Sequence, residues 1–337
     1  MQAGKLPLGL LSELLGRIEI NDPRVFLGAK PGEDAALIDF GDNYLVAKTD
    51  PITFASDLIG WYLVQVNCND LAVMGATPKW VMVTLLLPEG ISEAEVSDIF
   101  EQLLEACKAR NITLVGGHTE VTYDLPRPIA IGCMLGEVAK DRVVMTSGAR
   151  VGDSIILTQG ISIEGTALLA REATEQLLGA GVAVDVIDRA KGLLFDPGIS
   201  VSEAAEIACN AVDVHAMHDP TEGGIATGLL ELATGAGAGM RVELDKIQVL
   251  PECKVICDAL QLDPLGLIAS GALLATVSPD DAPQLIDALA SRSIPAFEIG
   301  RLTPAEQGLK LVTSQGEGEW PAFDRDELAR FFSGVEH

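Results

Sequence analysis

The stretch 66–78 combines an apolar helical repeat with polar side chains, and it constrains the fold more than any other part of the chain. Its apolar residues recur at helical spacing, while Gly75 and Pro78 are typical of a helix end. Asn67 and Asp70 share one face of this helix, because residues three apart are neighbours. The face is either an exposed polar stripe on a surface helix or part of a metal or phosphate site, since a buried carboxylate needs partners.

The composition excludes several classes of protein. Of the 337 residues, 48% are hydrophobic, and the mean hydropathy is +0.30, so we expect two folded domains of ordinary size rather than a disordered chain. A net charge of −26 argues against unassisted binding to nucleic acid or to an anionic membrane. No apolar run reaches the roughly 18 residues that span a bilayer, and the N-terminus lacks the layout of a signal peptide. We therefore expect a cytoplasmic protein.

The six cysteines are scattered through the expected helices and strands. Cys253 and Cys257 lie one helical turn apart, but no second pair at zinc-binding spacing accompanies them. Reduced, mostly buried thiols are therefore expected. Cys68 lies on the helix face opposite to Asp70, and we expect it in the core.

The alternation of strand and helix patterns predicts an α+β fold in two domains, residues 1–140 and 150–337. Residues 4–16 are expected to form a short amphipathic helix, and a capping box at Ser92 and Glu95 begins the third helix of the first domain. Asp50 and the following proline are expected to end a strand. The first-domain strands are expected near 35–38, 44–50, 80–87, 112–115 and 129–138.

The second domain is expected to contain a loop at 218–224 that leads into a helix from about residue 225 to 233. The glycine-rich run 235–239 ends this helix. It is not a dinucleotide-binding turn, because such a turn follows a strand. Further strands are expected at 153–158, 240–244 and 271–277, and further helices at 280–291 and 324–332.

Four aspartates stand at the ends of expected elements beside Gly, Ala or Pro: Asp34, Asp50, Asp70 and Asp219. Small neighbours let a ligand approach closely, and carboxylates supply the hard oxygen ligands that Mg²⁺ prefers. A Mg²⁺ ion that bridges nucleotide phosphates needs one or two carboxylates, so several acids indicate more than one ion. Taken singly, each aspartate is equally typical of a cap or a turn.

These acids lie within six strings that occur in order along the chain. The strings are Gly32-Glu33-Asp34-Ala35-Ala36, Thr49-Asp50, Asn69-Asp70-Leu71-Ala72-Val73-Met74-Gly75-Ala76, Gly116-Gly117-His118-Thr119-Glu120, Asp219-Pro220-Thr221-Glu222-Gly223-Gly224 and Ser270-Gly271-Ala272-Leu273-Leu274. Together they resemble the aminoimidazole ribonucleotide (AIR) synthase superfamily, which includes PurM, ThiL, selenophosphate synthetase and HypE. The strings at 69–76 and 219–224 look most like the HypE branch.

The resemblance implies two PurM-like α/β domains and a homodimer whose N-terminal sheets pair across the two-fold axis to form a barrel. It also implies ATP bound through Mg²⁺ rather than a P-loop, and activation of a substrate oxygen by phosphorylation. By position, Asp34, Asp50 and Asp70 match the metal-binding aspartates. Asp219 matches a catalytic acid of the second domain that faces the same cleft, and Asn69 is a candidate companion ligand.

Several further residues are candidates for contacts with phosphate. Lys5 and Lys48 carry the appropriate charge, although a solvated lysine is an equally good interpretation of each. Thr221 and the backbone amides of Gly223 and Gly224 stand at the N-terminus of a helix, where an anion is stabilised. Ordinary helix capping is the alternative interpretation of this string.

Two histidines are candidates for catalysis. His118 stands where HypE and ThiL carry an acid, and Glu120 follows two residues later, so either side chain can replace the missing metal ligand. Histidine is a poor ligand for Mg²⁺, so His118 is also a candidate general base or a residue that only forms hydrogen bonds. His218 precedes Asp219, and it is either catalytic or, like His215, a partly buried loop histidine.

The end of the chain departs from the HypE pattern. HypE proteins act on a cysteine at their own C-terminus, whereas the last cysteine here is Cys257 and the chain ends at His337. We therefore expect a substrate that is separate from the chain's own tail.

The sequence predicts a homodimeric, Mg²⁺-dependent, ATP-using enzyme near HypE that acts on an unidentified small molecule or protein. A small-molecule kinase of the ThiL type, which leaves phosphate on its product, is the second hypothesis. The third is an ATP-binding maturation or assembly partner without turnover.

Overall fold

The computed structural model describes residues 5–6 and 8–334, so the last three residues of the tail considered above lie outside it. The described chain separates into two compact units. Unit 2 comprises residues 20–28 and 34–143, and unit 1 comprises the rest. Residues 5–19 therefore group with unit 1, although the sequence pattern assigns them to the first domain. No helix of the described chain is long and apolar enough to cross a membrane.

Unit 2 is built on a six-stranded sheet with the order β1-β2-β3-β6-β4-β5. Neighbouring strands are antiparallel except β4 and β5, which are parallel and are joined by a helix, because parallel strands need a long crossover. The strands are β1 (Val25–Leu27), β2 (Ala36–Phe40), β3 (Asn43–Ile52), β4 (Thr77–Pro88), β5 (Thr113–Thr122) and β6 (Ile129–Ala139).

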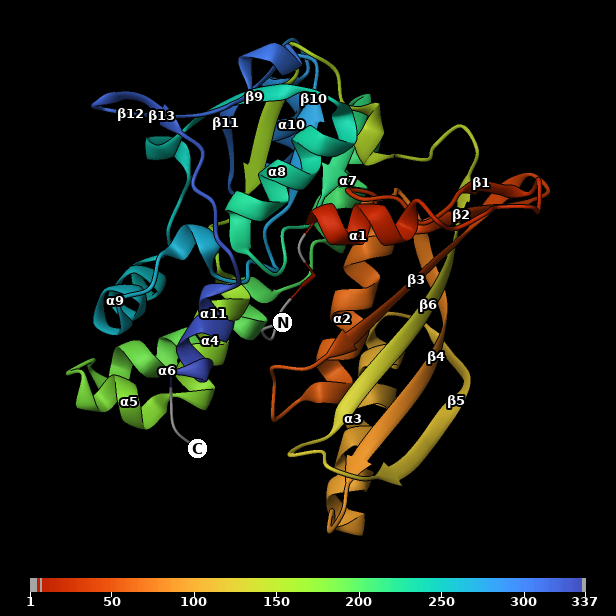
Figure 1. The fold of residues 1–337 in the computed structure, drawn as a ribbon, viewed down its shortest axis with the longest axis vertical. Helices are drawn as coiled ribbons and strands as arrows, with labels where there is room; N and C mark the ends of the chain where they lie inside the picture. The colour runs from red at the N-terminus through yellow and green to blue at the C-terminus, as the bar shows by residue number, and fades with distance from the viewer. Residues whose placement is uncertain (1–4, 7, 335–337) are drawn as a thin grey trace. The chain divides into compact units, whose positions relative to one another are not determined.

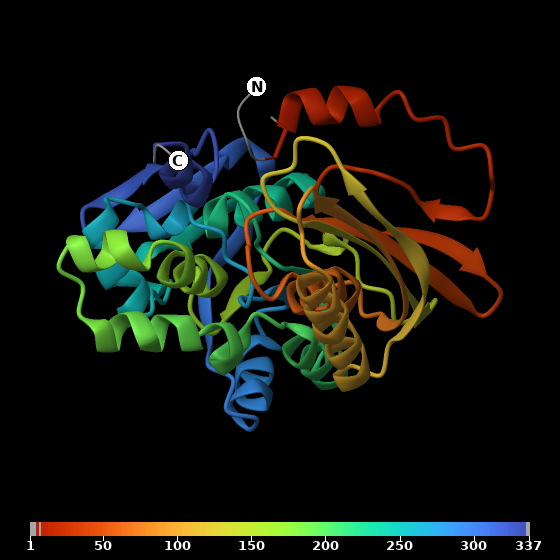
Figure 2. The same ribbon diagram turned by 90° about the horizontal axis from the view of Figure 1, so that it is seen from below.

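Helices α2 (Ile59–Ala72) and α3 (Glu93–Ala109) pack against each other on one face of this sheet, as Figure 1 and Figure 2 show. Ser92 Oγ accepts a hydrogen bond from Glu95 N at 3.2 Å, and Glu95 Oε2 accepts one from Ser92 N at 2.8 Å. The predicted capping box is therefore present. It satisfies two of the backbone donors that a helix start leaves without partners.

Helix α2 is buried along almost its whole length, in contrast to the amphipathic α3. Asn67 is fully buried and Asp70 is only 3% exposed. The interpretation of this face as an exposed polar stripe is therefore wrong. A carboxylate at this depth requires partners within the protein.

Two strands of unit 2 extend further than the sequence pattern indicates. β5 continues through 116–120 because each of these residues pairs with β4, so this string is strand rather than loop. Gly117 has a φ of +151°, and a Cβ atom there would lie 1.8 Å from Val83 O, so only glycine permits the pairing. β3 continues through Asp50 and Pro51, where only β6 pairs with it, and a strand with one open side tolerates proline.

Unit 1 contains a seven-stranded sheet with the order β13-β12-β9-β11-β7-β10-β8. All its pairs are antiparallel except β12 with β9. The strands are β7 (Ser154–Thr158), β8 (Val214–His218), β9 (Gly239–Glu243), β10 (Leu274–Val277), β11 (Ala296–Thr303), β12 (Leu309–Thr313) and β13 (Gly316–Glu319).

Helix α8 (Gly224–Ala236) packs on this sheet and buries Ile225, Leu229 and Leu232 in a core that includes Leu157 of β7. Helices α7 and α10 pack against each other, and α4, α5, α6 and α9 form a further helical group. The remaining helices of unit 1 are α1 (Leu8–Leu15), α4 (Ile163–Glu172), α5 (Thr174–Gly179), α6 (Val184–Gly192), α7 (Ser202–Ala211), α9 (Pro251–Leu260), α10 (Ala282–Ala290) and α11 (Glu327–Ser333).

The mixed α+β class with two sheets is confirmed. Within the described residues neither sheet closes into a barrel, since the first ends at β1 and β5 and the second at β13 and β8. The sequence pattern does not predict β8, β11, β12 or β13. His215 and His218 consequently lie in strand β8 and not in a loop.

Candidate functional site

Lys48 lies among three carboxylates in unit 2. Its Nζ donates a hydrogen bond to Asp70 Oδ1 at 3.0 Å and lies 3.7 Å from Asp50 Oδ2. Burial alone would lower the pKa of Lys48, but the charges of Asp70, Asp50 and Asp34 outweigh it and hold the pKa above its ordinary value. The structure thus brings together three predicted metal ligands and one predicted phosphate contact.

Asn67 fixes the backbone beside this cluster. Its Oδ1 accepts a hydrogen bond from Asp50 N at 3.1 Å, and its Nδ2 donates to Asp50 O at 3.3 Å and to Leu63 O at 2.9 Å. The Asn67 side chain thereby holds β3 against α2. Strand β6 also approaches the Asn67 side chain closely. A Cβ atom added to Gly132 of β6 would lie 2.7 Å from Asn67 Nδ2. Asn69 is fully buried on the same helix.

The donor chemistry of this cluster fits a hard divalent cation such as Mg²⁺. Asp34, Asp50 and Asp70 offer carboxylate oxygens, which are the ligands that Mg²⁺ takes in proteins. Asp34 and Asp70 are both more than nine-tenths buried, so the protein shields them from competing water. Within the described residues these three carboxylates are not gathered around one point, so holding the cation would require their side chains to shift from the positions they take near Lys48.

His118 and Glu120 lie apart from the three aspartates within the described chain. Both are on β5, the edge strand, and β6 and β4 separate β5 from β3. His118 Nε2 and Glu120 Oε2 lie 3.2 Å apart, and their side chains are 66% and 50% exposed. His118 also lines a mainly apolar pocket of about 240 Å³ between β4, β5 and α3. Neither residue is brought to the Lys48 cluster by the fold of unit 2.

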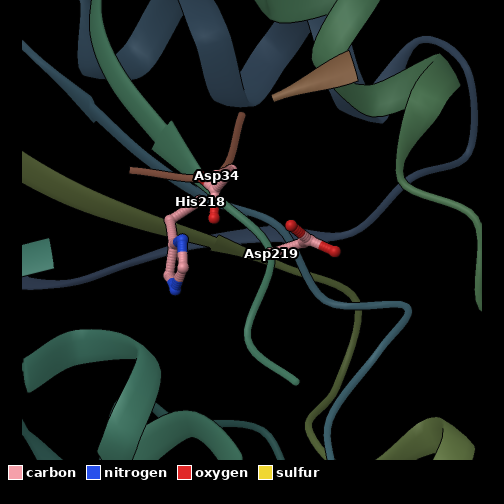
Figure 3. A group of neighbouring side chains, drawn as sticks. All are labelled: Asp34, His218 and Asp219. Carbon is pink, nitrogen blue, oxygen red and sulfur yellow. The ribbon is translucent and has the colours of Figure 1, made fainter. Parts of the chain in front are cut away.

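His218 and Asp219 are consecutive residues at the end of β8 in unit 1, as Figure 3 shows. Both are buried, and His218 Nε2 lies 3.1 Å from Glu231 Oε2 on α8. Figure 3 also labels Asp34, which begins the second segment of unit 2. His218 is thus held by a carboxylate, the arrangement that fixes the orientation of an imidazole ring.

Glu231 connects three of the predicted residues of unit 1. Lys5 Nζ donates to Glu231 Oε1 at 3.4 Å and to Thr221 Oγ1 at 3.2 Å. Burial would raise the pKa of Glu231, but the hydrogen bond from His218 and the charge of Lys5 outweigh it and lower the pKa to about 2. Glu231 is therefore an ionised partner that holds Lys5, Thr221 and His218 in one network.

The predicted phosphate contacts at Gly223 and Gly224 are corrected by their hydrogen bonds. Gly223 N donates to Asp326 Oδ2 at 2.7 Å, and Gly224 N donates to Thr221 O at 3.0 Å. A carboxylate of the protein itself thus takes the place at the N-terminus of α8 where an anion is stabilised. Neither amide is available to a phosphate in this arrangement.

The sequence pattern does not identify Glu231 or Asp326 as site residues, and it places Asn67 only on the same helix face as Asp70. Asn67 gives a usable signal, because it lies three residues before Asp70 on the same helix. Glu231 and Asp326 give none, since their partners lie far away in the sequence. Cys68 is 1% exposed, so its predicted place in the core is confirmed, and burial raises the pKa of its thiol to about 12.

These features define a protein of two α+β units with an acidic cluster around a lysine in one unit and a buried acid–histidine pair in the other. The sequence matches the family described as AIR synthase related protein. The model of its N-terminal domain matches residues 32–138, and the model of its C-terminal domain matches residues 150–311. The chain belongs to the AIR synthase-related family.

Relatives within this family align over most of the chain. A Methanocaldococcus jannaschii protein named for hydrogenase expression or formation is 29% identical over 322 residues, which cover 93% of this chain and 92% of the relative. The carbamoyl dehydratase HypE of Rhizobium leguminosarum bv. viciae is 27% identical over 309 residues, covering 86% of this chain and 82% of the relative.

Solved structures share the fold along nearly the whole chain. The hydrogenase maturation protein HypE in complex with ATP superposes with a TM-score of 0.71 at 22% identity, covering 97% of this chain and 98% of that one. AaThiL complexed with AMPPCP and TMP gives a TM-score of 0.72 at 20% identity, covering 94% and 95%. These neighbours establish the PurM-like fold of the family for this chain.

Proposed function

We propose that this chain is a cytoplasmic, Mg²⁺-dependent, ATP-using enzyme that activates a substrate oxygen by phosphorylation. One observation carries the proposal: Asp70 and Asp50 lie 3.0 and 3.7 Å from Lys48 Nζ, and the charge of Asp34 acts on the same lysine. Phosphoryl transfer requires positioning and neutralisation of negative charge more than covalent chemistry by the protein. A partly buried lysine beside several carboxylates supplies a cationic phosphate contact and a set of ligands for Mg²⁺.

When bound, Mg²⁺ would neutralise charge on the phosphate oxygens. In this proposal the three aspartates hold the ion, and Lys48 contributes its own positive charge to the phosphates. Asn67 keeps the Asp50 backbone in place through the hydrogen bonds on both of its peptide groups. In unit 1, Asp219 and His218 are the candidate acid and base, and Glu231 orients His218.

The relatives support an ATP-using enzyme of this family. The solved HypE is in complex with ATP, and the ThiL neighbour carries AMPPCP. The HypE relative is named a carbamoyl dehydratase, and a further relative at 26% identity is named a selenide, water dikinase. The HypE-like reaction, in which phosphorylation of an oxygen leads to its elimination as phosphate, is the first choice for this chain.

Two alternatives make different predictions. A kinase of the ThiL type leaves the phosphoryl group on its product, whereas a dehydration releases inorganic phosphate. A maturation or assembly partner binds ATP without turnover, and the solved complex of HypE with HypF supports a role with a protein partner. Product analysis after incubation with ATP separates the three.

We also propose that the chain has an N-terminal domain at residues 1–140 and a C-terminal domain at residues 150–337. In this proposal the chain forms a homodimer, and the sheets of the two N-terminal domains pair to form a shared barrel. The sheet face of unit 2 opposite α2 and α3 is only partly buried, as Met82 of β4 at 42% exposed illustrates. A second copy that covers this face would bury this side chain. Light scattering of Met82→Lys, compared with the unchanged chain, tests the dimer.

Calorimetric titration of the purified protein with ATP, with and without Mg²⁺, tests the main proposal. We expect binding only when Mg²⁺ is present, because the carboxylates repel the phosphates without it. Absence of binding under both conditions would contradict the proposal.

A further inference from the structure

One carboxylate ties the turn that precedes Asp34 to a second stretch of unit 1. Glu33 Oε2 accepts a hydrogen bond from Thr146 N at 3.0 Å, and Glu33 Oε1 accepts one from Ser147 N at 3.1 Å. These two amides begin the short helix η1 (Thr146–Gly148), and within the described chain the residue before η1 offers it no side-chain cap. Glu33 therefore supplies, from 113 residues away, the acceptor that a helix start needs.

Glu33 and η1 stand at the two ends of the main segment of unit 2. This segment is residues 34–143, so the chain leaves unit 1 directly after Glu33 and returns to it at Val144. The two hydrogen bonds of Glu33 thus join the exit and the return of the chain on the unit 1 side. Since Asp34 is bonded directly to Glu33, the backbone of Asp34 loses freedom when Glu33 is held.

The same turn is packed against helix α8. Gly32 has a φ of +84°, and a Cβ atom there would lie 2.9 Å from Glu231 O, so only glycine permits this approach. A Cβ atom on Gly235 of α8 would lie 2.9 Å from Thr146 Cγ2 and 3.5 Å from Gly32 O. The two glycines bring the turn, η1 and α8 together, so the turn is fixed by packing as well as by hydrogen bonds.

A direct role as a metal ligand is the alternative for Glu33, because it stands beside a predicted ligand. Both Glu33 oxygens bind backbone amides, whereas the charge of Asp34 acts on Lys48 of unit 2. Releasing Glu33 to a cation would break two hydrogen bonds of a charged acceptor. The arrangement therefore favours Glu33 as a support for Asp34.

We propose that Glu33 is a positioning residue of the Mg-ATP site, and that it fixes the backbone presenting Asp34 by binding the amides at the start of η1. The inference rests on the proposed function, because it assigns a supporting residue to that site. Residues that orient a metal ligand typically contribute about tenfold or more to metal affinity. A change at Glu33 should therefore weaken Mg-ATP binding, and should do so through Asp34.

Two substitutions remove the support to different degrees. Glu33→Ala removes both hydrogen bonds, and Glu33→Gln is the milder variant because it keeps one acceptor oxygen. We expect about tenfold weaker Mg-ATP binding in calorimetry for Glu33→Ala and a smaller loss for Glu33→Gln. Asp263→Ala is the matched control and should leave the affinity unchanged. Asp263 Oδ1 accepts from Leu265 N at 2.9 Å and so caps another short helix of unit 1, η4 (Pro264–Gly266).

A double variant shows whether Glu33 acts through Asp34. In an Asp34→Asn chain, which has lost the carboxylate that Glu33 positions, adding Glu33→Ala should cause no further loss of Mg-ATP affinity. An equal loss in the presence and absence of Asp34→Asn would mean that Glu33 acts independently of Asp34, and would overturn the inference.

Amide hydrogen exchange of the protein without ligand tests the two hydrogen bonds themselves. The amides of Thr146 and Ser147 should lose protection in Glu33→Ala and keep it in Asp263→Ala. Unchanged protection in Glu33→Ala, or unchanged Mg-ATP affinity in that variant, would overturn the positioning role. Absence of Mg-ATP binding by the unchanged chain would instead contradict the proposed function and remove the site that Glu33 supports. Exchange and calorimetry therefore distinguish the two failures.

Discussion

Lys48 Nζ on strand β3 and Asp70 Oδ1 on helix α2 lie 3.0 Å apart, and the Asp70 side chain is only 5% exposed. Lys48 is partly exposed, but a pair with one buried partner still loses stability when one member is removed, because the other charge is left uncompensated. Here Asp50 and Asp34 also act on Lys48, so the charge of Lys48 keeps partners when Asp70 is lost. The surplus of acid over base in this cluster indicates a role in binding a cation.

Asp70→Asn should therefore weaken Mg-ATP binding with little loss of fold. The substitution keeps the shape of the side chain and removes one carboxylate from the proposed ligand set, so we expect at least about a tenfold loss of affinity in calorimetry. The thermal unfolding midpoint should stay close to that of the unchanged chain.

Asp39→Asn is the control for this substitution. Asp39 also pairs with a lysine in unit 2, since its Oδ2 accepts from Lys140 Nζ at 2.6 Å, but its side chain is 43% exposed. We expect unchanged Mg-ATP affinity in Asp39→Asn. Equal affinities in the two variants would show that the acidic cluster does not bind the nucleotide.

Asn67→Ala should destabilise unit 2. The change leaves Asp50 N without its acceptor and Leu63 O without its side-chain donor in a buried region, so we expect about 1–3 kcal/mol less free energy of unfolding. Denaturant unfolding measures this difference. Asn21→Ala, at an exposed position of the same unit, should stay within about 0.5 kcal/mol, and a similar loss in both variants would refute the role of Asn67.

Local patterns predict the α+β class and the elements of unit 2 other than β1, because those elements are signalled by nearby residues. The Ser92–Glu95 capping box and the Gly75 and Pro78 signals at the end of α2 are examples. The extent of β5 is not predicted, since the two consecutive glycines indicate a turn in the sequence. Only the pairing of Gly117 with β4 makes them strand residues.

The sequence likewise predicts those residues of the candidate site that have a local signal and misses those that do not. Asp50 and Asp70 each stand near the end of an element with small neighbours, so the sequence identifies both. Glu231 carries no such signal, because its partner Lys5 is remote in the chain. The sequence also gives no sign that the Gly223 amide donates to Asp326, because Asp326 lies more than a hundred residues later.

Gly117→Ala should disrupt the edge of the unit 2 sheet far more than Gly116→Ala. Both glycines have φ values above +150°, so both substitutions strain the backbone. Only at Gly117 would the new Cβ atom meet Val83 O at 1.8 Å, whereas nothing lies within 4 Å of that atom at Gly116. We expect Gly117→Ala to lose about 1–3 kcal/mol more than Gly116→Ala in denaturant unfolding. Equal losses would show that β4 and β5 pair less closely.

Glu164→Gln should change how stability depends on pH. Burial raises the pKa of Glu164 to about 7 in the folded chain, whereas the ordinary value is 4.5, so the folded state binds more protons between these values. Stability then falls as pH rises from about 4.5 through about 7, and the full penalty, on the order of 3 kcal/mol, is present above that interval. Glutamine cannot ionise, so the variant does not lose stability in this way.

Denaturant unfolding at pH 4.5, 6 and 8 should therefore show the variant gaining stability relative to the unchanged chain as pH rises. A constant difference across the three pH values would mean that Glu164 already ionises with an ordinary pKa in the folded protein.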